Sequence, residues 1–201
     1  MRFVVSGTDT NIGKTVFCAG LCGLLNLPYW KPVQAGLDSP TDSDVVAEFG
    51  GVETLPERYR LKLPASPHQA AASEGVTIDP AALTPPDGDV VIEGAGGLMV
   101  PLTNDTLFID VFARWKLPLI LCSRTRLGTI NHTLLSLEAL RSRAIPVHGV
   151  AFIGDANAES ERIICAKGNV KRLGRLPVIE PLTPPRLQAV FAKCFDKADF
   201  A

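Results

Sequence analysis

The stretch that decides the fold is GTDTNIGKT, from Gly7 to Thr15. It ends in Gly13-Lys14-Thr15, as does the phosphate-binding loop G-x-x-x-x-G-K-[ST]. The first glycine of that consensus would fall on Thr8, whereas Gly7 stands one residue earlier. The stretch is therefore either a phosphate loop with one additional residue or a Gly-Lys-Thr tripeptide at an ordinary helix start.

The residues on either side favour the phosphate loop. The apolar run at 3–6 predicts a strand, and the residues from 14 to 25 predict a helix. Loop amides and the N-terminus of that helix can then converge on one anion. In such a loop Gly13 lets the backbone approach phosphate, Lys14 reaches the outer phosphates, and the Thr15 hydroxyl can ligate Mg²⁺.

A second motif, DVVIEGAGG from Asp89 to Gly97, supports the same interpretation. A buried strand that ends in an acid, here Glu93, is where a P-loop fold places a carboxylate near Mg²⁺. The glycines after it keep the mouth of the strand open to a ligand. The bland alternative is a strand followed by a flexible turn, but the two motifs in this order predict nucleotide binding.

Composition places the chain among ordinary globular domains. Its 201 residues suit one domain, 1–201, and 46% of them are hydrophobic. Twenty basic and 21 acidic residues give a net charge of −1, which offers no global field to nucleic acid or an anionic membrane. No run reaches the ~18 apolar residues of a spanning helix. We expect a cytoplasmic protein whose five cysteines are free thiols.

Short apolar runs alternate with helix-period segments, which predicts an α/β fold of three layers with a mainly parallel central sheet flanked by helices. The predicted strands are 3–6, 29–33, 90–93, 117–122 and 147–153, and the predicted helices are 14–25, 43–49, 107–115, 130–143, 159–167 and 185–195. The segment 50–88 is rich in Pro, Ala and Ser and carries little strand signal. We interpret it as an insertion that lines a site or an interface.

With both motifs identified, the chain resembles the dethiobiotin synthetases over most of its length, through GTDTNIGKT, KPVQAG, SDVV, SPH, EGAGGLMVPL and LGTINHT. In that family the phosphate loop is one residue longer than usual, which accounts for Gly7. The resemblance implies a cyclo-ligase that uses ATP, Mg²⁺ and CO2 to close a ureido ring on 7,8-diaminopelargonate in biotin biosynthesis. It also implies a homodimer with the site at the subunit interface.

The resemblance implies roles for individual residues. Lys14, Lys31 and Thr10 match the catalytic residues, which steady the carbamate and the γ-phosphate. The matching nucleotide-binding positions are Gly7, Asp9, Thr10, Asn11, Ile12, Gly13, Lys14, Thr15, Val16, Gly154 and Pro177.

Metal and substrate positions follow in the same way. The implied Mg²⁺ ligands are Thr15, Asp44 and Glu93, with Asp42 as a competitor for the role of Asp44. The implied substrate positions are Lys31, Ala35, Glu93, Gly94, Gly96 and Gly97, with Gly128, Thr129 and Asn131 supplied by the partner subunit. Because a carbamate route requires no histidine, we interpret His132 as structural.

Several positions depart from the family pattern. Asn11 stands where many members carry glutamate, and Ala35 replaces a hydroxyl residue, so we expect a cost in rate. The asparagine that often reads adenine is replaced by Ile153 and Gly154. Asp155, Asn157 or backbone groups near Pro177 could take over that role, and a relaxed nucleotide preference is one hypothesis.

Three other classes remain as alternatives. A partitioning or regulatory ATPase usually carries a second lysine inside the phosphate loop, which this loop lacks. An amidoligase of the cobyrinate type normally brings a glutaminase domain, for which the 201 residues leave no room. A binding-only module would leave Lys31, Asp44 and Glu93 unexplained as a set.

Overall fold

The computed structural model describes residues 1–38 and 40–201. Within them, seven parallel strands form one sheet in the order β4-β2-β6-β1-β7-β8-β9, and β3 and β5 form a second, two-stranded sheet. The strands are β1 (Arg2–Gly7), β2 (Tyr29–Trp30), β3 (Val33–Ala35), β4 (Thr54–Leu55), β5 (Tyr59–Leu61), β6 (Val90–Gly97), β7 (Leu119–Arg124), β8 (Val147–Ile153) and β9 (Arg172–Leu176).

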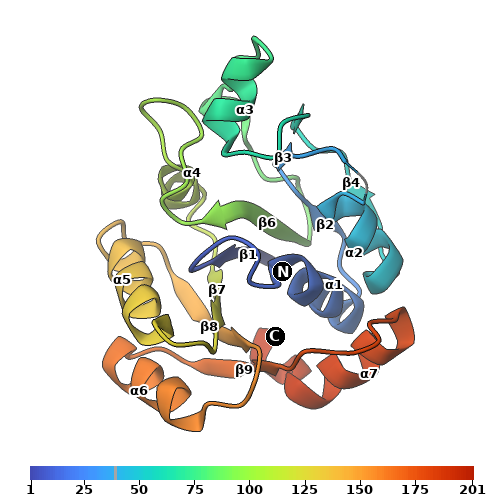
Figure 1. Ribbon diagram of the computed structural model, residues 1–201, viewed down its shortest axis with the longest axis vertical. Coiled ribbons are helices and arrows are strands. Elements are labelled where there is room, and N and C mark those ends of the chain that lie inside the picture. Colours follow the sequence, from blue (N-terminus) through green and yellow to red (C-terminus); the bar gives the residue numbers. More distant parts are fainter. Residues whose placement is uncertain (39) are drawn as a thin grey trace.

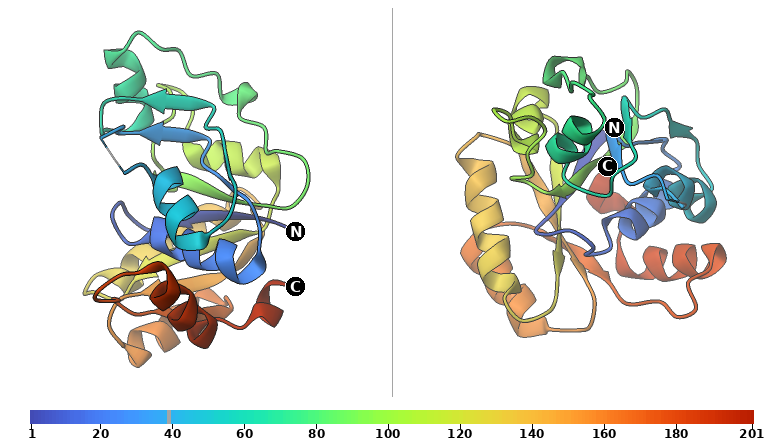
Figure 2. Two further views of the ribbon diagram at one scale, coloured as in Figure 1. Left: turned by 90° about the vertical axis from the view of Figure 1, so that its right-hand side faces the viewer. Right: turned by 45° about the horizontal axis from the view of Figure 1, so that its top comes forward.

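Helices cover both faces of the large sheet, which confirms the three-layer prediction (Figure 1). They are α1 (Lys14–Leu25), α2 (Asp42–Gly50), α3 (Pro67–Ser73), α4 (Phe108–Trp115), α5 (Thr129–Arg141), α6 (Ala158–Gly168) and α7 (Pro184–Cys194), with the short 3₁₀ helices η1 (Pro80–Ala82) and η2 (Lys197–Phe200). Helices α1, α2 and α7 lie on one face, and α4, α5 and α6 lie on the other (Figures 1 and 2). Each predicted helix is present to within two residues at either end.

A hydrophobic cluster lies on each side of the sheet. Phe17 of α1 packs against Phe191 and Phe195 around α7 on one side. Phe108 and Phe112 of α4 belong to the cluster on the other side, together with buried residues of α5 and α6. Burying apolar surface on both faces explains why the central strands carry continuous apolar runs and not an alternating pattern.

Strand order positions the site. β1 lies between β6 and β7, so the loop that follows β1 and the glycines that end β6 meet at the same edge of the sheet. Gly7 is the register partner of Gly97. Open α/β sheets bind their ligands at the carboxyl ends of the strands, where the strand order reverses.

Three expectations about strands were wrong. The predicted strand at 29–33 divides at Pro32, which has no N–H for a ladder: β2 joins the large sheet, and β3 pairs with β5. The segment 50–88 does contain strands, since β4 is the edge strand of the large sheet. β9 was missed because its sequence, RLGRL, carries two arginines and a glycine instead of an apolar run.

Among residues 1–38 and 40–201, no helix combines the length and the apolar character that crossing a bilayer requires. The five cysteines are free, as expected.

Candidate active site

The phosphate loop has a backbone that leaves amides available to an anion. Asn11 and Gly13 adopt positive φ angles of 54° and 94°. A Cβ on Gly13 would lie 3.1 Å from Cγ2 of Ile153. Both this close approach and the positive φ angle disfavour any residue other than glycine here. Gly13 is also the N-cap of α1 and places no side chain over the first helical amides. A helix N-terminus that is open in this way is suited to phosphate.

Lys14 is buried beneath this loop, with 6% of its surface exposed. Its Nζ donates to the Asp9 carbonyl oxygen at 3.0 Å, and the Asp9 carboxylate pairs with Arg124 at 2.9 Å. The Thr10 amide donates to the same carboxylate. Asp9 therefore stabilises the loop through contacts within it, to Thr10 and Lys14, and through the ion pair with Arg124 at the end of β7.

Four side chains from four elements meet beside the loop. Lys31, which follows β2, places its Nζ 2.5 Å from Oδ2 of Asp42 and 3.1 Å from Oε1 of Glu93. The Thr15 hydroxyl lies 2.8 Å from Oδ1 of Asp42 and 3.1 Å from Oε1 of Glu93, and donates its one hydrogen to either. This quartet of Thr15, Lys31, Asp42 and Glu93 surrounds a cavity of about 280 Å³ that opens onto the phosphate loop.

Tyr29 completes the contacts of Glu93. Its hydroxyl donates to Oε2 at 2.9 Å, and both side chains are buried. Since Oε1 faces Thr15 and Lys31, the phenol fixes the far oxygen and so the orientation of the carboxylate. No sequence motif pointed to Tyr29.

The electrostatics of the quartet favour charged groups. Burial alone would lower the pKa of Lys31, but Glu93 and Asp42 outweigh it and raise that pKa above its ordinary value. Burial alone would raise the pKa of Asp42, yet Lys31 and the Thr15 hydroxyl bring it below the usual range. For Lys14, burial dominates and the pKa is lowered, with Lys31 adding to the effect. Lys31 and Asp42 are thus ionised at neutral pH.

Asp44 is not part of this cluster. Its Oδ2 accepts hydrogen bonds from the amide of Thr41 at 2.9 Å and from the Thr41 hydroxyl at 2.7 Å, in a capping box at the start of α2. The expectation that Asp44 accompanies Thr15 and Glu93 is therefore corrected: Asp42 occupies that place. The sequence TDSD already indicated this role for Asp44, because a threonine three residues before an acid is typical of a capping box.

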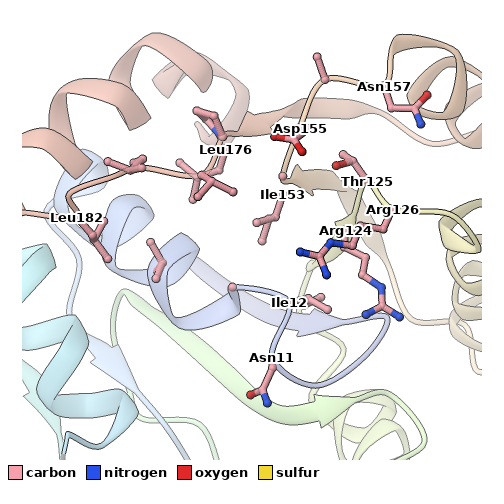
Figure 3. A pocket seen from close by; sticks show the side chains of 17 residues that line it. Asn11, Ile12, Arg124, Thr125, Arg126, Ile153, Asp155, Asn157, Leu176 and Leu182 are labelled. Carbon is pink, nitrogen blue, oxygen red and sulfur yellow. The ribbon is translucent and has the colours of Figure 1, made fainter.

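A cavity of about 560 Å³ adjoins the loop on the side of β8 and β9 (Figure 3). It is lined by Asn11, Ile12, Gly13, Val16, Arg124, Thr125, Arg126, Ile153, Gly154, Asp155, Ala156, Asn157, Leu176, Pro177, Val178, Ile179 and Leu182. The predicted nucleotide positions Gly154 and Pro177 are among them. The amide of Gly154, however, already donates to the Leu176 carbonyl, so it is not free to contact a base.

A second cavity, of about 590 Å³, is lined by Lys31 and Asp42 of the quartet. Thr10, Ala35, Gly96 and residues 64–67 contribute to its lining, so the segment 50–88 supplies four residues to this cavity. Gln34 also lines it: Nε2 donates to the carbonyls of Ala35 and Gly36, while Oε1 is buried without a partner among the described residues. An unpaired buried acceptor calls for a donor from a ligand or water.

The remaining predicted substrate glycines have structural reasons for being glycine. A Cβ on Gly94 would lie 2.7 Å from Phe112, and one on Gly96 would lie 3.1 Å from the Thr10 hydroxyl. Gly97 approaches Gly7, where a Cβ would lie 3.4 Å from the carbonyl. Gly94 thus makes room for Phe112 of α4, whereas Gly96 and Gly97 let β6 and the phosphate loop approach each other.

The segment at 128–131 does not reach the quartet within this chain. Thr129 is buried and its hydroxyl is bonded to Ser123, so its side chain is not free for substrate. Gly128 and Asn131 are exposed at the start of α5. His132 is exposed too, and its ring makes no hydrogen bond to the described residues, which does not fit the structural role predicted for it.

Known proteins are similar to this chain over nearly its whole length. A family model described as an AAA domain matches residues 1–186. An "ATP-dependent dethiobiotin synthetase BioD" of Afipia carboxidovorans is 62% identical over 205 residues, which cover 99% of this chain and 98% of that protein. The proteins with the same name from Agrobacterium fabrum and Sphingopyxis alaskensis are 62% and 58% identical, and each alignment covers at least 97% of both chains.

Solved structures show the fold alone. A ParA family ATPase from Chlorobium tepidum superposes with a TM-score of 0.53 at 12% identity, covering 96% of this chain and 91% of the other. A chain of the MinC:MinD cell division protein complex of Aquifex aeolicus gives 0.54 at 10% identity, covering 94% and 92%. These likenesses confirm a P-loop architecture, and the sequence relatives decide the family. The chain belongs to the family of ATP-dependent dethiobiotin synthetases.

Proposed function

We propose that this protein closes the ureido ring of dethiobiotin from 7,8-diaminopelargonate, CO2 and ATP. The observation that carries the proposal is the meeting of two buried lysines, Lys14 and Lys31, with two carboxylates beside an open phosphate loop. The nucleotide cavity shares Gly13 and Val16 with the quartet cavity, and the diamine cavity shares Lys31 and Asp42 with it. Membership of the family supplies the identity of the substrates.

The reaction needs cationic groups. In the route that the family resemblance implies, an amine of the substrate takes up CO2 as a carbamate, and a carbamate oxygen attacks the γ-phosphorus while ADP leaves. The second amine then attacks the carbonyl carbon, and phosphate leaves as the ring closes. Each step brings anionic oxygens together, so fixed positive charge lowers the barrier. Lys14 serves the phosphates, and Lys31 serves the carbamate and the transferred phosphoryl group.

Thr15, Asp42 and Glu93 would hold Mg²⁺. All three offer oxygen, which hard cations prefer, and the Lys31 ammonium already bonds to both carboxylates, so the pair accepts a cation. When bound, Mg²⁺ would neutralise charge on the β- and γ-phosphates. Asp42 thus takes the role expected of Asp44.

The cavity beside Lys31 would take the diamine. Gln34 offers its unpaired Oε1 to a substrate N–H, since its own Nε2 is committed to backbone carbonyls. Thr10 lines both this cavity and the quartet cavity, where its hydroxyl can donate to a carbamate oxygen. The small Ala35 contributes no donor, which accords with the predicted cost in rate.

We also propose a homodimer formed through the α5 face. Leu127, Leu135 and Met99 are large apolar residues exposed by 104%, 61% and 53%, and Leu135 and Met99 line one shallow cavity. Gly128 and Asn131, exposed nearby, would then face the substrate of the partner subunit. The cytoplasmic location expected from the sequence stays a prediction.

The experiment measures phosphate release with MgATP and bicarbonate, with and without 7,8-diaminopelargonate. We expect release to require the diamine, to fall at least about a hundredfold in Lys31→Met, and to be unchanged in Lys167→Met, an exposed lysine of α6. Release that proceeds equally without the diamine would contradict the proposal and favour a regulatory ATPase.

A further inference from the structure

Gly154 and Asp155 form part of the lining of the nucleotide cavity, and an arginine outside the cavity bonds to the backbone of Gly154. Arg175 of β9 donates from Nη1 to the Gly154 carbonyl oxygen at 3.0 Å. Its Nε lies 3.5 Å from Oε1 of Glu161, a residue of α6 that is only 4% exposed. Arg175 does not line the cavity itself.

Arg175 and the part of the cavity lining formed by Leu176 lie on opposite faces of the sheet. Leu176, the next residue, belongs to the cluster around α1 and α7 and lines the cavity. Arg175 pairs instead with Glu161 of α6, on the other face. Successive side chains of a strand alternate between faces, so this division follows from the strand geometry. Because the Gly154 carbonyl accepts from Arg175, it points toward the α6 face and away from Leu176.

The direction of that carbonyl fixes the direction of the next amide. The Gly154–Asp155 peptide bond is trans, and in a trans peptide the N–H points opposite to the C=O. The Asp155 amide consequently points toward the cavity, and no described residue accepts a hydrogen bond from it. Figure 3 shows Asp155 at the rim of the cavity, between Ile153 and Asn157.

The peptide has little freedom to turn. Gly154 has a φ of 122°, and its own amide donates to the Leu176 carbonyl at 2.9 Å. A Cβ at Gly154 would lie 2.6 Å from the Thr125 hydroxyl oxygen. Both backbone polar groups of Gly154 are thus hydrogen-bonded, the amide to Leu176 and the carbonyl to Arg175.

We propose that Arg175, oriented by Glu161, is a positioning residue that keeps the Asp155 amide turned toward the nucleobase as a hydrogen-bond donor. The amide would donate to an acceptor atom on the edge of the base, a role that the apolar side chain of Ile153 cannot perform and for which Gly154 has no side chain. The proposal rests on the proposed function, because it assigns the base of the nucleotide to this cavity.

The chain offers a matched control. Arg172 pairs with the same Glu161, at 2.8 Å and 2.7 Å, but makes no contact with Gly154. Both arginines lie on the α6 face because a register irregularity in β9 follows Arg172. Replacing either arginine leaves Glu161 with the other, so both variants keep a partner for the buried carboxylate.

The experiment measures the affinity of the whole protein for MgATP and for magnesium tripolyphosphate, which has no base, by titration calorimetry. We expect Arg175→Met to weaken MgATP binding about tenfold, the effect of about one hydrogen bond, and to leave tripolyphosphate binding unchanged. Arg172→Met should change neither affinity. Arg175→Lys, which retains a donor and the charge, should give an intermediate value for MgATP. Melting temperatures establish that each variant is folded.

Four results would overturn the proposal. Two concern Arg175→Met: an unchanged affinity for MgATP, or an equal loss of affinity for MgATP and tripolyphosphate. The third is that Arg172→Met weakens MgATP binding as much as Arg175→Met does. The fourth is that the wild-type protein binds MgATP and tripolyphosphate equally well. A wild-type protein that binds neither ligand would overturn the proposed function as well. That last result is thereby distinguished from failure of the Arg175 assignment alone.

Discussion

Two substitutions in α2, Asp42→Asn and Asp44→Asn, distinguish the proposed metal ligand from the helix-capping residue. Asp42 and Asp44 are two residues apart, yet Asp42 contacts Lys31 and Thr15, whereas the side chain of Asp44 is bonded to Thr41 alone among residues 1–38 and 40–201. In each variant an amide of nearly the same size replaces a carboxylate, so each variant loses one negative charge. Only the first removes charge from the quartet.

The effects on stability should be small and similar. Asp44→Asn can keep both hydrogen bonds from Thr41, because both reach one oxygen, but it loses the negative charge that strengthens them, at a cost of about 0.5–1 kcal/mol. For a chain of this size that corresponds to a melting temperature about 1–4 °C lower. In Asp42→Asn the Lys31 ammonium keeps Glu93 at 3.1 Å, so the loss is about 1–2 kcal/mol, well below that of a stranded buried charge.

The effects on metal dependence should differ. Phosphate release in the presence of the diamine is measured against Mg²⁺ concentration at fixed ATP. We expect Asp42→Asn to raise the half-maximal Mg²⁺ concentration at least about tenfold, since a neutral amide replaces a carboxylate ligand. Asp44→Asn should leave it unchanged. The reverse pattern, with Asp44→Asn alone raising the Mg²⁺ requirement, would refute the assignment of Asp42.

Two further predictions follow from buried groups. Tyr29→Phe removes the donor to Oε2 of Glu93, and we expect a loss of about 1–3 kcal/mol in unfolding free energy together with a higher Mg²⁺ requirement; an unaltered Mg²⁺ titration would show that the hydroxyl does not orient Glu93. His148 packs on Phe3 and Phe200, and burial lowers its pKa, so its stabilising contribution is complete above the unfolded pKa of about 6.5 and is lost as pH falls through the lower folded value. The urea midpoint should therefore drop between about pH 7.5 and about pH 5.5, and by less in His148→Gln; an equal drop in both proteins would contradict it.

The sequence predicted the parts of the fold that rest on local patterns. The phosphate loop, with its preceding apolar strand and following helix, is recognisable without any tertiary contact. Helix α1 was predicted at its observed bounds, and β8 likewise. Strands such as β9, whose positions are set by pairing with β8 and by ion pairs with α6, carry no such pattern.

The site was predictable to the extent that its residues occur in motifs. Lys14, Thr15 and Glu93 stand at the ends of predicted elements, and Lys31 lies in the predicted strand 29–33; neighbouring parallel strands bring such residues to one edge of the sheet. The choice between Asp42 and Asp44 depends on the rotation of α2 about its axis, which the capping box at Thr41 sets. The contacts of Tyr29 and Arg175 join elements that are distant in the sequence, so no spacing could reveal them.

The most direct test of ring closure follows radiolabelled bicarbonate into product. The protein is incubated with MgATP, 7,8-diaminopelargonate and the labelled bicarbonate, and both acid-stable label in dethiobiotin and released phosphate are measured. The account predicts one phosphate for each labelled ring, with both signals lost in Lys31→Met. Phosphate release without label in an acid-stable ring would contradict it, since the ATP would then be hydrolysed without ring formation.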